Sequence, residues 1–293
     1  VGSAPDSWGV WFPDDPRQTP YTRFLDEVAE SGYEWIELGP YGYLPTDPAV
    51  LRQELGARGL QLLSAFVPVK LVDAAAHEAG AEAALKVGKL LAALGAQYIV
   101  LADDNGSVPE LVAKAGQRTG SALTSAQWDV FARGVNLVAR RINNELGLKV
   151  AFHHHCAGYV ETPVEAAELL ARTDDQLVGL CLDTGHWHYA GGDAAAAIQE
   201  LKGRVTYLHL KDCHTEIAAK CRAAGKNYFE AVKAGVFCAL GEGEVDFPAV
   251  KANMLALGYD GWAIVEQDIL TEDLDVPKRF SAANRAYLKS IGL

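Results

Sequence analysis

The chain has 293 residues, and its 26 Lys and Arg against 38 Asp and Glu give a formal net charge of −12. With 49% hydrophobic and 22% charged residues, the composition is that of a folded globular protein and excludes a disordered chain. The acidic balance, without a basic stripe, argues against a nucleic-acid partner. No apolar run approaches the roughly 20 residues that span a bilayer, so we expect no membrane partner.

The cysteine pattern is not that of a disulfide framework, because the number is odd and the spacing unpaired. The five residues are Cys156, Cys181, Cys213, Cys221 and Cys238. No cationic start with a following apolar segment is seen, so we expect no secretory signal. The sequence therefore predicts reduced thiols in a cytoplasmic protein.

Short β-branched or apolar runs alternate with longer amphipathic stretches, which is typical of βα units and a parallel sheet. The runs predict eight strands, at Val1–Ala4, Trp35–Leu38, Leu60–Phe66, Tyr98–Leu101, Lys149–His153, Val178–Leu182, Val205–Leu210 and Gly261–Val265. Helical spacing between them predicts helices at Tyr21–Ser31, Pro48–Ala57, His77–Leu94, Ser125–Glu145, Val164–Arg172 and Phe247–Leu257. Most of these helices end before a glycine or a short polar turn.

Eight βα units in a chain of this length predict an α/β fold with a single closed (β/α)₈ TIM barrel, forming one domain over residues 1–293. A doubly wound sheet is the alternative, but no glycine-rich phosphate turn follows the first strand. About thirty residues after the seventh strand break the rhythm, and we expect a helical insertion that serves as a lid or substrate wall. This segment, 212–240, could also reach a second copy of the chain, so a homo-oligomer stays open.

Ionisable groups gather at the ends of the predicted strands, where the active sites of such barrels lie. They are Glu37, His153-His154-His155, Asp183-Thr184-Gly185-His186, His209 with Lys211, and Glu266-Gln267-Asp268. A buried charge is costly unless it is paired or bound to a metal. Carboxylates with imidazoles suit Mn²⁺, Co²⁺, Fe²⁺ or Zn²⁺, so we expect a divalent-metal site at the mouth of the barrel.

Residues two apart on a strand face the same way. We therefore expect His153 and His155 to point into the barrel and His154 toward the helices. His209 and Lys211 share a face in the same way. Taken singly, each group also has a simpler explanation, such as a hydrogen-bonded core histidine or a salt-bridged carboxylate.

Several other polar and aromatic residues have less definite expectations. We expect Asp212, Asp268 and Glu161 to be solvated or capping residues. The aromatic side chains near the first strands could stack on a sugar-like ring or simply pack; they are Trp8, Trp11, Phe12 and Trp35.

Six segments together resemble a known family. They are Ala4-Pro5-Asp6-Ser7-Trp8-Gly9, His153-His154-His155, the run from Gly179 to His186, His209-Leu210-Lys211-Asp212, Gly241-Glu242-Gly243 and Gly258-Tyr259-Asp260-Gly261-Trp262. They look like the myo-inosose-2 dehydratase branch of the xylose-isomerase-like TIM-barrel superfamily, whose members are sugar isomerases, epimerases and dehydratases. The resemblance runs over nearly the whole chain.

The resemblance implies a divalent metal held by a Glu after strand five, an Asp after strand six, a His on strand seven and a Glu after strand eight. Three of these positions carry over as Asp183, His209 and Glu266, but the strand-five position is His153. Three alternatives are open for the fourth ligand: His153 binds the metal, His155 binds it in place of His153, or the metal has three protein ligands and extra water. The substrate-contacting His of the superfamily resembles His186.

The function that the resemblance implies is a metal-dependent hydro-lyase that removes water from a cyclic polyol ketone through a metal-stabilised enolate. We expect Mn²⁺, with Co²⁺, Fe²⁺, Mg²⁺ or Zn²⁺ as alternatives. Expected catalytic residues are His155, His186, Lys211 and Glu266, and expected substrate-binding residues are Trp8, Glu37, His155, His186 and Lys211. Spacing does not decide which group is the base. A divalent-metal ketose 3-epimerase, an aldose–ketose isomerase and a non-catalytic sugar-binding barrel are the alternatives.

Overall fold

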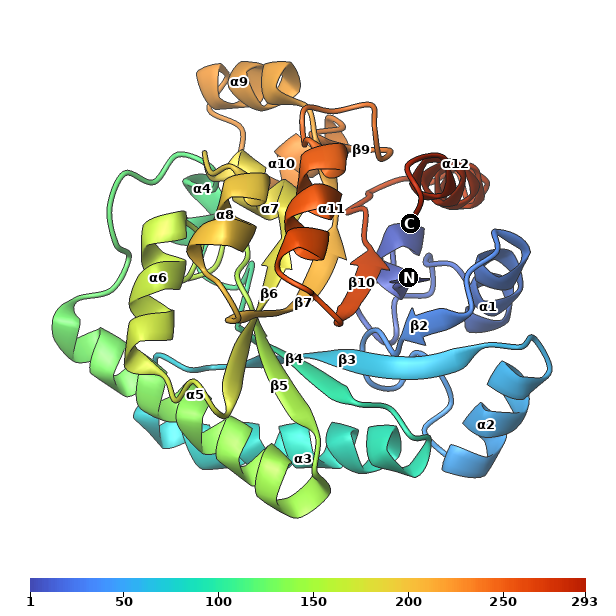
Figure 1. Ribbon diagram of the computed structural model, residues 1–293, viewed down its shortest axis with the longest axis horizontal. Coiled ribbons are helices and arrows are strands. Elements are labelled where there is room, and N and C mark those ends of the chain that lie inside the picture. The colour runs from blue at the N-terminus through green and yellow to red at the C-terminus, as the bar shows by residue number, and fades with distance from the viewer.

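The computed structural model describes residues 1–293, in which eight parallel strands close into a barrel in the order β1-β10-β7-β6-β5-β4-β3-β2. The barrel strands are β1 (Gly2–Ser3), β2 (Trp35–Glu37), β3 (Gln61–Val69), β4 (Tyr98–Asp103), β5 (Lys149–His153), β6 (Val178–Asp183), β7 (Val205–Leu210) and β10 (Trp262–Val265). Helices surround these strands on the outside (Figure 1). The predicted TIM barrel is therefore confirmed, with strand ends that differ from the predicted ones by at most three residues.

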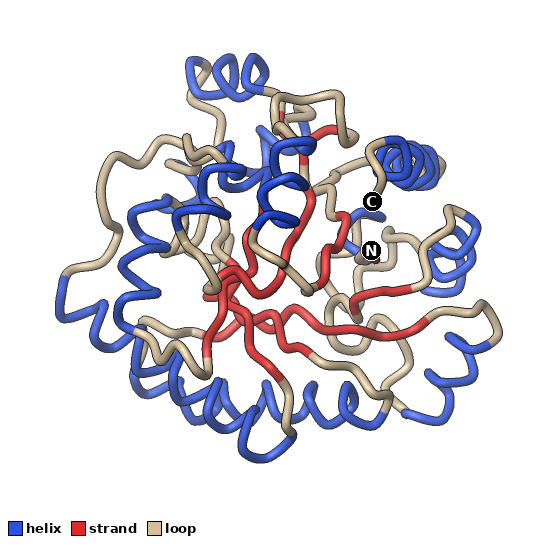
Figure 2. Tube along the Cα trace, viewed as in Figure 1, coloured by secondary structure: helices blue, strands red, loops and turns tan.

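Twelve α-helices accompany the strands. In the tube view, helices lie around the strands (Figure 2). They are α1 (Tyr21–Glu30), α2 (Pro48–Gly56), α3 (His77–Ala93), α4 (Pro109–Ala113), α5 (Ser125–Leu146), α6 (Pro163–Arg172), α7 (Thr184–Tyr189), α8 (Ala194–Glu200), α9 (Thr215–Ala223), α10 (Tyr228–Lys233), α11 (Phe247–Ala256) and α12 (Val276–Ser290). Two short 3₁₀ helices, η1 (Pro5–Trp8) and η2 (Ala74–Ala76), complete the set. None of the helices combines the length and the apolar character needed to cross a bilayer.

The longest helix that the sequence pattern did not predict is α12. Its buried residues are Pro277, Ser281, Asn284 and Leu288, which recur at helical spacing but are mostly polar or small. The helix therefore lacks the apolar stripe by which an amphipathic helix is recognised in a sequence. The buried Asn284 amide is satisfied by two hydrogen bonds, because its oxygen accepts the Leu240 N–H at 2.8 Å and its nitrogen donates to Gln267.

The inside of the barrel is filled by a compact set of side chains. Its buried apolar members are Ala4, Leu63, Tyr98, Val100, Ala151, Cys181, Tyr207 and Ile264. The rings of Tyr98 and Tyr207 lie 5.1 Å apart, centre to centre. Because this layer is packed, only the carboxyl-terminal mouth of the barrel is left for chemistry.

The predicted helical insertion is present after β7. The antiparallel strands β8 (Asp212–Cys213) and β9 (Phe237–Cys238) close its base, and α9 and α10 lie between them in the chain. Figure 1 shows α9 and α10 on one side of the molecule, beyond α7. Asp212, expected to be solvated or capping, is not solvated, because its buried carboxylate accepts the N–H groups of Gly241, Gly243 and Val245 at 2.8–3.1 Å.

All five cysteines are buried free thiols. Cys156, Cys213 and Cys221 lie in the apolar cluster that joins the insertion to α7 and to the loop after β5. The thiols there pack as small apolar groups.

Candidate metal centre

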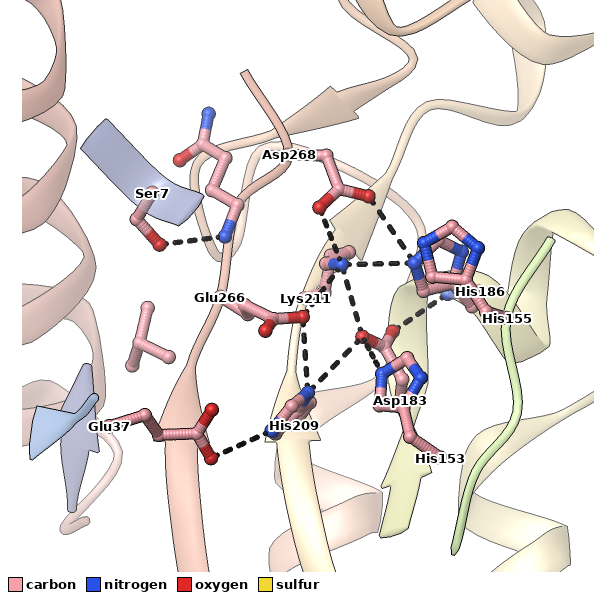
Figure 3. A network of polar contacts seen from close by, with 12 residues as sticks. Ser7, Glu37, His153, His155, Asp183, His186, His209, Lys211, Glu266 and Asp268 are labelled. Carbon is pink, nitrogen blue, oxygen red and sulfur yellow. Dashed lines mark hydrogen bonds and ion pairs between the residues drawn. The ribbon is translucent and has the colours of Figure 1, made fainter. Parts of the chain in front are cut away.

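Four side chains from neighbouring strands converge at the mouth of the barrel. His153 ends β5, Asp183 ends β6, His209 lies on β7 and Glu266 follows β10. The strand register places Asp183 directly beside His209, and the Glu266 N–H donates to the Leu210 carbonyl of β7. All four residues are buried, and one ligand atom from each lies within 4.8 Å of the others. We call these four residues the metal-centre cluster (Figure 3).

Several polar atoms of this cluster lack an ordinary hydrogen-bond partner. Asp183 Oδ2, His209 Nδ1 and both ring nitrogens of His153 are buried and unpartnered. His209 Nδ1 lies 3.1 Å from Glu266 Oε2 and 3.9 Å from Asp183 Oδ2, and His153 Nε2 lies 3.5 Å from Asp183 Oδ2. Buried polar atoms are costly without a partner, and two carboxylates with two imidazoles form a donor set for a divalent ion of borderline hardness. The residues present therefore fit a divalent cation.

The Asp183-to-His186 segment has a local reason for each residue. Asp183 is the N-cap of α7, with its Oδ1 accepting the His186 N–H at 2.8 Å, so only Oδ2 faces the cluster. The Thr184 hydroxyl donates to the Lys211 carbonyl at 2.7 Å. A Cβ on Gly185 would lie 2.6 Å from the Lys211 Cγ, so only glycine leaves room for that side chain.

The other face of His209 is held by Glu37. His209 Nε2 lies 3.1 Å from Glu37 Oε1, and the same oxygen accepts hydrogen bonds from Ser64 at 3.0 Å and Tyr207 at 2.7 Å. A carboxylate bonded to one nitrogen of an imidazole fixes the orientation of the ring, and here it leaves Nδ1 facing the metal-centre cluster. This buried residue thus holds His209 from within the barrel, and its contact with substrate stays a prediction.

Lys211 is fully buried between three carboxylates (Figure 3). Its Nζ lies 3.1 Å from Asp183 Oδ2, 2.9 Å from Glu266 Oε2 and 3.0 Å from Asp268 Oδ1. Burial alone would lower the pKa of Lys211, but the three negative charges outweigh it and hold the pKa well above its usual value. Lys211 is therefore an ammonium ion that donates hydrogen bonds to these carboxylates and does not act as a base.

Two further acidic residues, Asp268 and Asp6, belong to the site. Asp268, expected to be solvated or capping, is buried and paired with Lys211. The alternation of side chains along a strand, which places His209 and Lys211 on one face, predicts that Asp268 shares a face with Glu266, two residues before it. Asp6 follows β1, and both its carboxylate oxygens are buried without a hydrogen-bond partner, close to Glu266 and Asp268.

The three consecutive histidines separate as the alternation of a strand requires. His154 points toward the helices, with its ring against Trp187 and its Nε2 accepting the Asp183 N–H at 3.1 Å. His155 lies away from the metal-centre cluster, with its ring centre 4.0 Å from that of His186. Burial, and secondarily the nearby His186, hold the pKa of His155 well below its usual value, so this imidazole is neutral. Of the two candidates for the strand-five ligand, His153 is thus the one beside Asp183.

Trp8, which is predicted to bind substrate, is packed in the core. It is 2% exposed, its indole N–H donates to Glu27 of α1 at 2.8 Å, and its ring packs edge-on against Phe24. The partner carboxylate lies 19 residues along the chain, so no local pattern revealed it. Trp35 packs against Trp262 with ring centres 4.5 Å apart, at the amino-terminal ends of their strands.

Glu161 belongs to a second buried charge cluster, which we call the loop clamp: Arg118, Glu161 and Glu165. Arg118 pairs with Glu165 at 2.8 Å, and Glu161 accepts the N–H groups of Gly116 and Ala157. Glu161 is buried and is not the solvated or capping residue expected. The loop clamp ties the segment after β4 to the loop after β5, which carries His155.

Comparison with known proteins agrees with the fold. A family model described as xylose isomerase-like TIM barrel matches residues 25–287. The inosose dehydratase of Salmonella typhimurium is 30% identical over 92% of this chain and 88% of its own length. The rhizopine catabolism protein MocC of Rhizobium meliloti is 32% identical over 88% of this chain and 79% of its own. A crystal structure of the IOLI protein with a bound zinc atom shares the fold, with TM-score 0.67 and 16% identity over 99% of this chain and 96% of that one.

Proposed function

This chain belongs to the xylose isomerase-like TIM barrel family, and from that premise we propose that it is a hydro-lyase that removes water from a cyclic polyol ketone of the inosose type. Relatives named as inosose dehydratases at about 30% identity over most of both chains support a sugar-processing dehydratase. The observation that carries the proposal is the metal-centre cluster, which has unpartnered buried atoms and whose two carboxylates contact the buried Lys211.

We propose that His153, Asp183, His209 and Glu266 hold a divalent cation, with Mn²⁺ as the first choice. The zinc atom in the IOLI protein shows that a protein of this fold can bind such an ion. When bound, a divalent cation acts as a Lewis acid that polarises a ketone oxygen and so makes the adjacent C–H bond more acidic. His153 takes the place of the family's strand-five carboxylate, which makes the donor set less negative by one charge.

The proposed base is His155, which removes the proton α to the ketone. Its Nδ1 is engaged by the Cys156 carbonyl, so the proton lies on Nδ1 and the lone pair on Nε2. The lone pair on Nε2 of a neutral imidazole can accept a proton, and a positioned base typically contributes about 10²–10⁴-fold in rate.

The proposed acid is Lys211, which protonates the departing β-hydroxyl. The C–H and C–O bonds break, a C=C bond forms, the proton moves to His155 Nε2, and water leaves with a proton from Lys211 Nζ. Return of one proton from His155 to Lys211 restores both groups. His186, with Nε2 3.1 Å from Lys211 Nζ, is placed to hold a neighbouring substrate hydroxyl, and Glu266 keeps the ammonium in position.

The charges around the site favour an uncharged polyol over a carboxylated ring. Asp183, Glu266 and Asp268 surround the single ammonium of Lys211, and a dication would only balance the remaining negative charge. The buried Arg118 is already paired in the loop clamp. A substrate carboxylate would therefore find no free cation, whereas hydroxyl groups can pair with carboxylates and imidazoles alike.

The test is a panel of inososes and ketohexoses incubated with the Mn²⁺-loaded protein and followed by ultraviolet absorbance and proton NMR. Dehydration of an inosose produces a conjugated product that absorbs in the ultraviolet, and this is the expected result. Solvent deuterium entering a ketohexose without new absorbance would instead establish an epimerase or isomerase. Binding of these compounds without turnover or exchange would leave a sugar-binding barrel.

A further inference from the structure

A tyrosine from the insertion enters the candidate site and has no role in the steps above. Tyr228 is the first residue of α10 and is 1% exposed. Its hydroxyl donates to Asp268 Oδ2 at 2.7 Å and lies 3.4 Å from His155 Nε2. The side chain therefore touches both the residue that pairs with Lys211 and the proposed base.

The placement of Tyr228 is fixed by local structure. Asn227 and Glu230 form a reciprocal capping box, which starts α10 at Tyr228. The Tyr228 ring lies edge-on to His155 at 5.3 Å and roughly parallel to His186 at 6.1 Å, centre to centre. A side chain held by a capped helix and by neighbouring rings has little freedom to move, so its hydroxyl is a preorganised donor.

Asp268 connects this tyrosine to Lys211. Its Oδ1 lies 3.0 Å from Lys211 Nζ, while Oδ2 accepts the Tyr228 hydroxyl and lies 3.3 Å from His186 Nε2. The insertion also supplies Phe237, whose ring lies 5.3 Å from the Lys211 ammonium. Two aromatic residues of the insertion thus support the group that we assign as the acid.

We propose that Tyr228 is a positioning residue that acts through Asp268 to hold the Lys211 ammonium in place for proton delivery. The inference rests on the proposed dehydration and deepens it, because it makes the insertion a working part of the active site and not only a cover. Loss of the hydroxyl removes the shortest contact of Asp268 Oδ2 and leaves only His186 Nε2 at 3.3 Å, so the carboxylate is held less firmly against Lys211.

The test compares Y228F with wild type and with Y189F, a matched tyrosine in the same apolar cluster that lies outside the catalytic groups. We expect Y228F to lower kcat for inosose dehydration about 10- to 100-fold, the effect of losing a hydrogen bond to a charged group. KM should stay within about twofold, because ground-state binding is not involved. Y189F should match wild type. Unchanged kcat in Y228F, or an equal loss in Y189F, would overturn the proposal.

A double-mutant cycle with D268N tests the route through Asp268. If Tyr228 acts through that carboxylate, Y228F should have no further effect on kcat in the D268N background, and additive losses would contradict this. A crystal structure of Y228F gives a readout that does not depend on activity. We expect Asp268 to move away from Lys211, and an unchanged Asp268 would refute the inference. The proposed function is refuted by a different result, namely that wild type dehydrates no inosose.

Discussion

The metal-centre cluster and the loop clamp are both buried groups of charged residues near the mouth of the barrel, but their acceptor atoms are used differently. In the loop clamp, Glu161 accepts two backbone N–H groups, and Glu165 accepts three besides its pair with Arg118. In the metal-centre cluster, His209 Nδ1 and the ring nitrogens of His153 have no hydrogen-bond partner, and Asp183 Oδ2 is contacted by side chains of the site, with Lys211 Nζ 3.1 Å away. A buried carboxylate whose lone pairs are taken by the backbone fixes loops, whereas unused lone pairs that converge are available to a ligand.

Removing a carboxylate from the metal-centre cluster gives the largest expected effect. We expect D183A and E266A each to lose stoichiometric metal and to lower dehydration at least about 10³-fold, because several kcal/mol of Lewis-acid stabilisation disappear. Metal content by mass spectrometry and initial rates on the same samples measure both effects.

The control for these variants is D183N, because asparagine also caps helices and should keep α7 in place. We expect D183N to fold like wild type and still to bind metal poorly. Stoichiometric metal in both alanine variants would show that the metal ligands are wrongly assigned.

The matching change in the loop clamp should affect stability and leave metal binding intact. E165Q removes the charge that pairs with Arg118, whose side chain is 7% exposed. Breaking one partner of such a buried pair should lower the free energy of unfolding by about 2–4 kcal/mol. Urea unfolding measures this loss, and metal titration should give the wild-type stoichiometry. A variant of normal stability that binds no metal would erase the distinction between the two regions.

Much of the barrel, and part of the site, could be predicted from the sequence. The strand β5 is present as predicted, and alternation along it correctly separated His154 from its neighbours. These features are local, since they depend on the alternation of side chains along a strand and on where strands end. The same alternation places Asp268 on the side of Glu266, so the spacing already indicated that Asp268 faces the site.

Other features depend on contacts that no spacing reveals. Trp8 looked like a stacking residue because its partner Glu27 lies on the next helix. Glu161 and Asp212 looked like solvated residues because their partners are backbone N–H groups of distant loops. Tyr228 reaches the site only because the insertion folds back over α7; the capping box of its 6-residue helix marks where the helix starts but not what it contacts.

A smaller effect is expected from Glu37, which touches the metal-centre cluster only through His209. E37Q keeps the size of the side chain but removes the charge that fixes His209 through Nε2. Loss of such a supporting carboxylate typically lowers metal affinity about 10- to 100-fold, and we expect this result by isothermal titration. The matched variant S64A removes one donor to the same Glu37 oxygen and should change affinity much less. Equal affinities for E37Q and wild type would mean that Glu37 does not orient His209.

The smallest expected effect concerns Asp103, which ends β4 and combines features of both regions. Its Oδ2 accepts the Tyr159 N–H at 2.6 Å, as a clamp residue would, but its Oδ1 is buried without a partner. Burial raises the pKa of Asp103 from an ordinary 3.8 to about 7, against the lowering effect of the Tyr159 hydrogen bond. The folded protein thus favours the protonated acid. The contribution of Asp103 to the free energy of unfolding is complete below pH 4 and is lost as the pH rises toward 7.

D103N keeps an oxygen acceptor for Tyr159 and carries no charge at any pH, so it should remove this pH dependence. We expect D103N and wild type to have similar free energies of unfolding near pH 4, and D103N to be more stable by about 1–2 kcal/mol at pH 8. Urea unfolding across this range measures the difference, which should grow between pH 4 and 7 and then level off. D103N could instead lose bound metal or activity while its stability stays that of wild type. That result would place Asp103 among the ligand-binding residues, with Oδ1 as the atom that contacts the ligand.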